Sequence, residues 1–289
     1  MKRTLNLLTA LLLAPLAAAH AVDLPLEKPA IISSPGAEFQ DEARSGAMII
    51  GMDRTPKGRI WGCWTGTGDK KDGYFLLAMS DDDGATWSKP RLAVGARTQP
   101  EQTLSGALVG NLWSDPKGRL WLFFDQQLGD PQGRITNWFI RCDDPDATDP
   151  KWSEPVRFAE GCTLNKPTVL KNGDWLLPVS DWQKKTARLF ASNDEGASWK
   201  ERGSLQFPDW EFDEHMTVEL RDGRLWMLAR TKGQPYESFS SDGGKTWSEP
   251  TPRFCAMPRA CTAPLIMVCV CFPDMPKERC PNRRRCGNP

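Results

Sequence analysis

The chain has 289 residues, and its 37 lysines and arginines balance 37 aspartates and glutamates, so that its formal net charge is zero. This balance creates no overall positive field, which argues against charge-driven binding to nucleic acid or to a membrane surface. We therefore expect no nucleic-acid partner and no membrane partner. The length is sufficient for one large hydrophobic core.

The first segment has the pattern of a secretory signal peptide. Met1-Lys2-Arg3 supplies positive charge, residues 5–19 are apolar, and small residues continue to Ala21. Such a segment is removed on export, and the small residues favour cleavage after Ala19 or Ala21. The apolar run is short for a membrane-spanning helix. We expect residues 1–21 to be a signal peptide and the mature protein to be secreted or periplasmic.

An octapeptide of the form Ser-x-Asp-x-Gly-x-Thr/Ser-Trp occurs three times, as box 1 (residues 80–87), box 2 (192–199) and box 3 (240–247). Its Asp can accept hydrogen bonds from N–H groups of its own loop, its Gly can adopt a positive φ, and its Trp can pack under the turn. An apolar run precedes each box. Each box therefore predicts a tight turn at the end of a strand.

A second motif, a glycine turn followed by an alternating apolar strand, repeats in phase with the boxes. Its glycines are Gly58, Gly118, Gly173 and Gly223. The unit that begins at Gly118 has only a degenerate box at residues 141–145. A period of about 50–60 residues with several short strands predicts an all-β β-propeller, with one four-stranded blade per repeat. A β-sandwich with similar hairpins is the alternative.

The repeat pattern ends after Pro250. From residue 254 onward both motifs are absent, and six of the nine cysteines lie in this stretch without the spacing of a zinc site. We expect an incomplete propeller over residues 22–253 and an aberrant Cys-rich tail over 254–289, produced by a shifted reading frame or a failed gene end. A disulfide-bonded tail is the alternative. The three other cysteines, which we expect to be buried, are Cys63, Cys142 and Cys162.

Few residue types remain for chemistry. His215 is the one histidine outside the first segment, and no metal cluster, phosphate-binding glycine loop or Gly-x-Ser-x-Gly occurs. We expect no metal and no cofactor. The candidates are carboxylates and arginines on loops, together with polar loop residues at Asn165, Lys166 and Trp182. These three side chains can line a central cleft, although solvated turns would have the same composition.

The boxes and the leader resemble the sialidase (neuraminidase) superfamily and its bacterial BNR-repeat (Asp-box) relatives, which are six-bladed β-propellers. The resemblance covers about residues 38–250, where about four blades are recognisable. It implies a monomeric, secreted exo-glycosidase, a hydrolase that takes a terminal, acidic sugar of a glycan as its carbohydrate substrate. The last blades of the family carry the nucleophilic Tyr and a third Arg, and the tail replaces them here, so the resemblance implies an impaired enzyme.

The resemblance also assigns roles to residues. Arg44 corresponds to the first arginine of a carboxylate-binding triad, and either Asp69 or Asp72 corresponds to the acid/base aspartate. The segment 213–230 is the firmest match, with Glu214 as the catalytic glutamate that accepts the proton of the Tyr, and Arg230 as the second arginine. A strand-end ion pair between Glu214 and Arg230 is the alternative interpretation.

Two other functions remain open from the sequence. Boxes of this kind also occur in propellers that are not enzymes, so a glycan-binding module and a partner-binding or structural propeller are both alternatives. The only tyrosines are Tyr74 and Tyr236, and neither matches the nucleophile position of the family.

Overall fold

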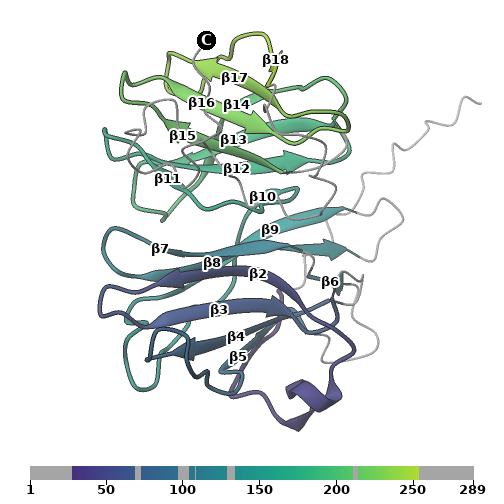
Figure 1. Cartoon of the computed structure of the whole chain (residues 1–289), viewed down its shortest axis with the longest axis vertical. Helices are drawn as coiled ribbons and strands as arrows, with labels where there is room; N and C mark the ends of the chain where they lie inside the picture. Colours follow the sequence, from purple (N-terminus) through teal and green to yellow (C-terminus); the bar gives the residue numbers. More distant parts are fainter. Residues whose placement is uncertain are drawn as a thin grey trace, which may run out of the picture. The chain divides into compact units, whose positions relative to one another are not determined.

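The protein is built almost entirely from antiparallel sheets. The computed structural model describes residues 28–68, 73–96, 104–107, 109–128, 134–210 and 214–253. Besides two short 3-10 helices, Ala37–Phe39 and Asp41–Ala43, these residues form four sheets, which Figure 1 shows in chain order. All of their strands belong to one compact unit that ends at Pro252. The predicted all-β class is confirmed. The predicted signal peptide and the predicted tail lie outside the described residues.

The first two sheets have five strands each. In sheet 1 the order is β1-β5-β4-β3-β2, and in sheet 2 it is β10-β9-β8, where both β6 and β7 pair with β8. The strands of sheet 1 are β1 (Ile31–Ser33), β2 (Met48–Arg54), β3 (Ile60–Thr65), β4 (Phe75–Ser80) and β5 (Leu92–Val94). Those of sheet 2 are β6 (Leu104–Gly106), β7 (Gly110–Ser114), β8 (Leu120–Leu128), β9 (Ile135–Cys142) and β10 (Val156–Glu160).

The last two sheets have four strands each, in chain order. The strands of sheet 3 are β11 (Thr168–Val169), β12 (Trp175–Asp181), β13 (Thr186–Ser192) and β14 (Lys200–Leu205). Those of sheet 4 are β15 (His215–Glu219), β16 (Leu225–Ala229), β17 (Tyr236–Ser240) and β18 (Thr251–Pro252). One four-stranded sheet per repeat is the arrangement that the sequence period predicted.

Neighbouring sheets bury both faces of the strands between them. In β8 the side chains of Leu120, Leu122 and Phe124 belong to the core shared with sheet 1, whereas Trp121 and Phe123 belong to the core shared with sheet 3. This division follows from the two-residue period of a strand. It explains why the run from Leu120 to Phe124 is apolar without interruption. A third core lies between sheets 3 and 4 and includes Leu189 and Met227.

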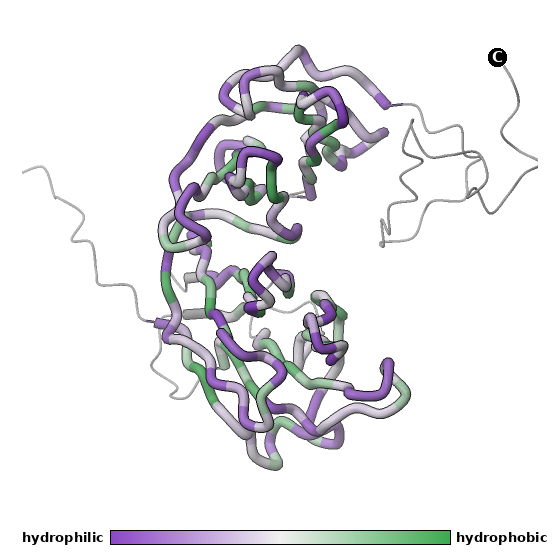
Figure 2. Tube along the Cα trace, turned by 90° about the vertical axis from the view of Figure 1, so that its left-hand side faces the viewer, coloured by the Kyte–Doolittle hydropathy of each residue, from purple (hydrophilic) through white to green (hydrophobic). Residues whose placement is uncertain are grey.

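The hydropathy of the chain changes from residue to residue. Figure 2 shows hydrophilic and hydrophobic colours alternating along the trace. The described part holds no helix with the length and hydropathy that a membrane crossing requires.

Each box forms the tight turn that the sequence predicted. In box 1, Thr86 donates to Asp82 from its N–H (2.8 Å) and from its hydroxyl (2.6 Å), while Ser80 Oγ donates to Asp82 (2.8 Å) and accepts from the Gly84 N–H (2.9 Å). Boxes 2 and 3 repeat these contacts around Asp194 and Asp242. Asp83 and Gly84 both have positive φ (58° and 87°), a conformation that glycine adopts at low cost and that aspartate tolerates better than most residues.

The degenerate box in sheet 2 contacts sheet 1. The carbonyl of Pro145 accepts hydrogen bonds from Trp61 Nε1 (3.2 Å) and from Arg59 Nη1 (3.1 Å). Trp152 packs edge-to-face on Trp61, with 5.7 Å between the ring centroids. The turn of the degenerate box is therefore held in part by residues of sheet 1.

The boxes lie at one end of the sheets. In sheet 4, β17 enters box 3 after Ser240, which pairs with Leu225, whereas the β16–β17 connection lies beyond the pair Ala229 and Tyr236. The predicted site residues of this sheet follow β16 and precede β15. They therefore lie at the end of the sheet opposite the box.

Candidate functional site

Glu214 and Arg230 form a close ion pair at the end of sheet 4. The last strand pair of β15 and β16 is His215 with Ala229, so the next residues outward face each other, and the Arg230 N–H donates to the Glu214 carbonyl at 2.9 Å. Arg230 Nη1 donates to both carboxylate oxygens of Glu214, at 2.9 and 2.6 Å. The two side chains are 33% (Glu214) and 27% (Arg230) exposed. The pair is therefore reachable from solvent, yet fixed by the strand register.

His215, the neighbour of Glu214, has a structural role. It is 2% exposed, and its Nε2 lies 3.0 Å from the carbonyl of Arg188, to which it donates. Its Nδ1 lies 3.2 Å from Ser180 Oγ. These contacts hold the ring between sheets 3 and 4, as expected of a histidine that carries no catalytic step.

Asn165 lies beside the Glu214–Arg230 pair, next to His215. Its side-chain Nδ2 donates to the carbonyl of His215 at 2.7 Å, which ties the loop between β10 and β11 to the first residue of β15. The exposed Trp182 (47%) follows β12 at the same end of sheet 3, two residues after Ser180, which contacts His215. The structure therefore brings four predicted site residues to one edge: Asn165, Trp182, Glu214 and Arg230.

Lys166 is used in a different way. Its ammonium group donates to the Met52 carbonyl (2.8 Å) and to Asp53 Oδ2 (2.9 Å), both in β2 of sheet 1. The same oxygen of Asp53 accepts the Ser114 N–H at 2.9 Å. Lys166 thus links sheet 3 to sheets 1 and 2. Asp53 was not singled out from the sequence, because its partner is 113 positions away.

Arg44 lies before β2, with its side chain 12% exposed. It pairs with Asp41, and its guanidinium carbon is 5.5 Å from the ring centroid of Trp64. Its Nε and Nη1 are buried without a hydrogen-bond partner in the described structure. No described contact joins Arg44 to Glu214 or Arg230. Asp69 and Asp72, the two candidates for the acid/base group, lie outside the described residues.

The two tyrosines serve packing. Tyr74 meets Phe39 edge-to-face, with ring centroids 5.3 Å apart, and Tyr236 packs against the core between sheets 3 and 4. The predicted burial of Cys63, Cys142 and Cys162 is confirmed. Burial raises the pKa of the Cys63 thiol above its ordinary range and that of Cys142 to about 11, so neither is a thiolate near neutral pH.

The chain resembles known proteins at the level of a domain family and of a fold. A family model described as a BNR repeat-like domain matches residues 58–265. Among solved structures, the Hadza microbial sialidase Hz136 superposes with a TM-score of 0.58 at 18% identity, over 73% of this chain and 47% of that chain. This chain therefore spans about half the length of Hz136. A search of curated proteins finds no match.

Two further structures give the same result. The intramolecular trans-sialidase from Ruminococcus gnavus superposes with a TM-score of 0.59 at 14% identity, over 76% of this chain and 73% of that chain. A protein of unknown function from Dyadobacter fermentans superposes with a TM-score of 0.54 at 18% identity, over 78% of this chain and 72% of that chain. The predicted sialidase-like β-propeller fold is confirmed. At these identities the likeness is one of fold, and activity has to be argued from the site.

Proposed function

Because the chain belongs to the BNR repeat-like domain family, we propose that it is a secreted, sialidase-like exo-glycosidase whose site takes a terminal acidic sugar at the edge that holds Glu214 and Arg230. The observation that carries this proposal is the Glu214–Arg230 pair, which is partly exposed and fixed at a strand end. The Ruminococcus gnavus relative was solved in complex with oseltamivir carboxylate, which is a carboxylate ligand.

Arg230 is suited to bind the carboxylate of such a sugar. A guanidinium has five N–H donors, and its hydrogen bonds to carboxylates are charge-assisted. In the structure both carboxylate oxygens of Glu214 accept from Arg230 Nη1. A sugar carboxylate therefore shares the guanidinium with Glu214 or displaces it, and the exposed ring of Trp182 offers a packing surface for the sugar.

Arg44 supplies a second indication. Its buried Nε and Nη1 have no partner among the described residues, and such donors are costly unless water or a ligand accepts from them. We propose that Arg44 also binds the carboxylate. The proposed catalytic roles remain those of the family resemblance, with Glu214 as the proton acceptor and Asp69 or Asp72 as the proton donor. Neither tyrosine of the chain matches the nucleophile position of the family, so the proposed enzyme is an impaired one.

The second candidate function is a glycan-binding propeller without turnover. The placement of the tyrosines favours it, because Tyr74 packs on Phe39 and Tyr236 packs on the core between sheets 3 and 4. These two tyrosines are the only ones in the chain.

Hydrolysis of an aryl α-sialoside distinguishes the two functions. The exo-glycosidase proposal expects slow release of the aryl alcohol by the full chain and a loss of at least about a hundredfold in Glu214→Gln. Glu219→Gln is the control, because Glu219 is the last residue of β15, at the opposite end of that strand from Glu214, and accepts the Lys171 N–H at 2.8 Å. Sugar binding without any turnover would select the binding propeller. If neither binding nor turnover is found, the acidic-sugar proposal is wrong.

A further inference from the structure

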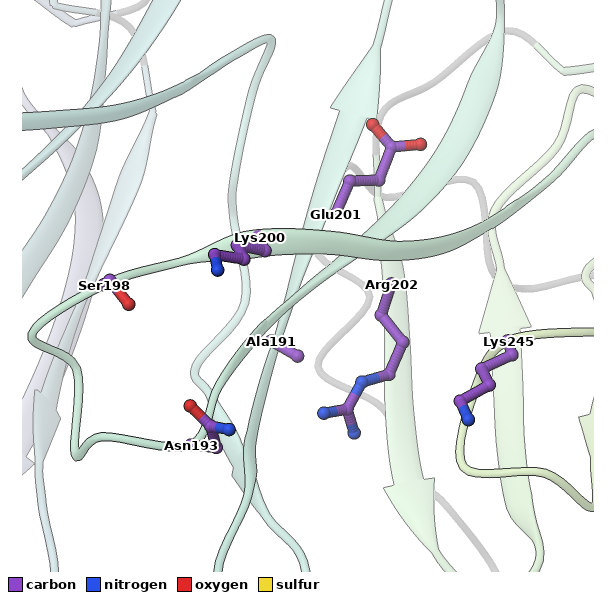
Figure 3. A pocket seen from close by; sticks show the side chains of 7 residues that line it. All are labelled: Ala191, Asn193, Ser198, Lys200, Glu201, Arg202 and Lys245. Atoms are coloured by element: carbon purple, nitrogen blue, oxygen red, sulfur yellow. The ribbon is translucent and has the colours of Figure 1, made fainter.

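A charged hollow lies at the box end of the sheets, away from Glu214 and Arg230. It has a volume of about 350 Å³ and lies between β14 and the turn of box 3 (Figure 3). Its lining residues are Ala191, Asn193, Ser198, Lys200, Glu201, Arg202 and Lys245. β17 is five residues long, and a strand rises about 3.3 Å per residue, so box 3 lies on the order of 16 Å from the β16–β17 connection.

The lining carries an excess of positive charge. Lys200, Arg202 and Lys245 are cationic, and Glu201 is the one carboxylate among the lining residues. Figure 3 shows the Glu201 carboxylate pointing away from Arg202, and one of its oxygens is 3.5 Å from Arg188 Nη1. Glu201 therefore offsets a charge outside the hollow.

The three cations differ in how they are held. Asp174 accepts from Arg202 Nη2 at 2.6 Å, which fixes the guanidinium while its side chain stays 20% exposed. Lys200 and Lys245 are both exposed, and neither ammonium group forms an ion pair with any described residue. The hollow thus combines one oriented guanidinium with two ammonium groups that lack a counter-charge in the described structure.

Another hollow at the box end of the sheets has no such excess of positive charge. It has a volume of about 320 Å³ and lies between box 1 and the degenerate box of sheet 2. Its cations are matched by carboxylates, since Arg54 pairs with Asp83 at 2.6 Å and Arg59 with Asp81 at 2.7 Å. Lys57 and Asp146 complete its charged lining. Positive charge is therefore compensated in the hollow between box 1 and the degenerate box, whereas the charges of Lys200 and Lys245 are not compensated.

We propose that the hollow lined by Lys200, Arg202 and Lys245 binds the sulfate or phosphate group of a ligand. A tetrahedral oxyanion, singly charged in a sulfate ester and up to doubly charged in a phosphate monoester, matches a guanidinium together with two ammonium groups. The amide of Asn193 is a further donor, whereas Ser198 Oγ is already committed to Asp194 at 2.6 Å. The lining has no aromatic ring on which a base or a sugar could stack. The site recognises the charged group and leaves the rest of the ligand in solvent.

Titration of the full chain with sodium sulfate and with sodium phosphate, at constant ionic strength against chloride, tests this site. Backbone amide resonances of Asn193 and Lys245 are expected to shift and saturate. Lys200→Gln and Lys245→Gln should each weaken binding about two- to fivefold, as the loss of one exposed ion pair predicts, and the double variant about tenfold. Both side chains are exposed, so the fold should be retained. Lys57→Gln, in the compensated hollow, should leave the affinity unchanged.

The source of the group is tested by comparing a sugar 6-sulfate with the same sugar 6-phosphate. Saturable binding of either one that is weakened in the double lysine variant supports the site, and the tighter of the two identifies a sulfated or a phosphorylated ligand. The proposal is overturned if chloride produces the same shifts, or if the double lysine variant binds sulfate as tightly as the unmodified chain. Because neither lysine contacts Glu214 or Arg230, failure here leaves the acidic-sugar proposal standing.

Discussion

Asp82 illustrates how a single carboxylate can hold a turn that is exposed to water. The hydroxyl and the N–H of Thr86 and the hydroxyl of Ser80 donate to it and lower its pKa to about 2. The equivalent contacts of Ser198 and Ser192 lower the pKa of Asp194 to about 2, and those of Thr246 and Ser240 lower that of Asp242. The ionised form of each aspartate is therefore the one that stabilises the fold.

This linkage gives a pH-dependent prediction for Asp82→Asn. A pKa that is lower in the folded state than the unfolded value of about 3.9 means that the contribution to stability is complete above about pH 4. It is lost progressively as the pH falls from about 4 through about 2, the pKa at which half of the folded-state carboxylates are protonated. We expect Asp82→Asn to lower the melting temperature at pH 7 and the difference from the unmodified chain to shrink between pH 4 and pH 2.

The neighbouring Asp83 provides the control for this experiment. Its carboxylate is 81% exposed and contacts Arg54, outside the hydrogen bonds of the turn. Asp83→Asn should change the melting temperature little, because asparagine also tolerates the positive φ of this position. A constant difference between Asp82→Asn and the unmodified chain from pH 7 to pH 2 would show that the charge of Asp82 does not stabilise the turn.

At the level of single residues, the sequence located the pair at the candidate site but missed its surroundings. Glu214 and Arg230 could be found because the motif around them is continuous in the chain. The Lys166–Asp53 ion pair and the Asn165–His215 hydrogen bond join residues that lie far apart in sequence. Such contacts depend on how the sheets pack, and no local pattern encodes them.

The turn of box 2 also serves the contact between sheets 2 and 3. Gly196 has a φ of 86°, and a methyl group there would lie 2.6 Å from a ring atom of Trp121 and 2.9 Å from one of Trp175. The glycine is therefore required for two reasons, its backbone conformation and the close approach of two rigid rings. Trp121 and Trp175 belong to the core between these sheets.

Two glycine substitutions separate these reasons. Gly196→Ala should lower the free energy of unfolding by about 1–3 kcal/mol for the backbone strain, and by more for the contact with the rings. Gly173→Ala has the same kind of strain, with a φ of 91° and no atom within 4 Å of the added carbon. Urea denaturation measures both. Equal losses in the two variants would contradict a packing role for Gly196.

Elements were predictable wherever a repeat marked them. The apolar runs before the boxes became β4, β13 and β17, and the segments after the glycine turns became β3, β8, β12 and β16. Two features could not be foreseen. β1 joins sheet 1 by pairing with β5, from Ile31 with Val94 to Ser33 with Leu92, and the degenerate box contacts Arg59 and Trp61. Both depend on long-range contacts and not on local propensity.

For the whole molecule, stability comes from contacts between successive sheets. Three shared cores connect the four sheets, and the strands of sheets 2 and 3 bury one face against the preceding sheet and one against the next. Repeat proteins of this kind are stabilised by nearest-neighbour interfaces. The fold presents loops of several sheets at one end, and the family resemblance, together with the exposed Glu214–Arg230 pair, makes that end the candidate site for a sugar.

The central claim is that Arg230 binds the carboxylate of an acidic sugar. Its most direct test is a titration of the full chain with N-acetylneuraminic acid and with its methyl ester, in which a methyl group replaces the charge of the carboxylate. The account predicts that the unmodified chain binds the acid saturably and binds the ester at least about tenfold more weakly. Arg230→Gln should also bind the acid at least about tenfold more weakly than the unmodified chain does, since a hydrogen bond to a charged group contributes about 1.5–3 kcal/mol. Arg224→Gln, at the opposite end of the sheet and paired with Asp222, should bind like the unmodified chain. Equal affinity for the acid and the ester, or unchanged binding in Arg230→Gln, would contradict the account.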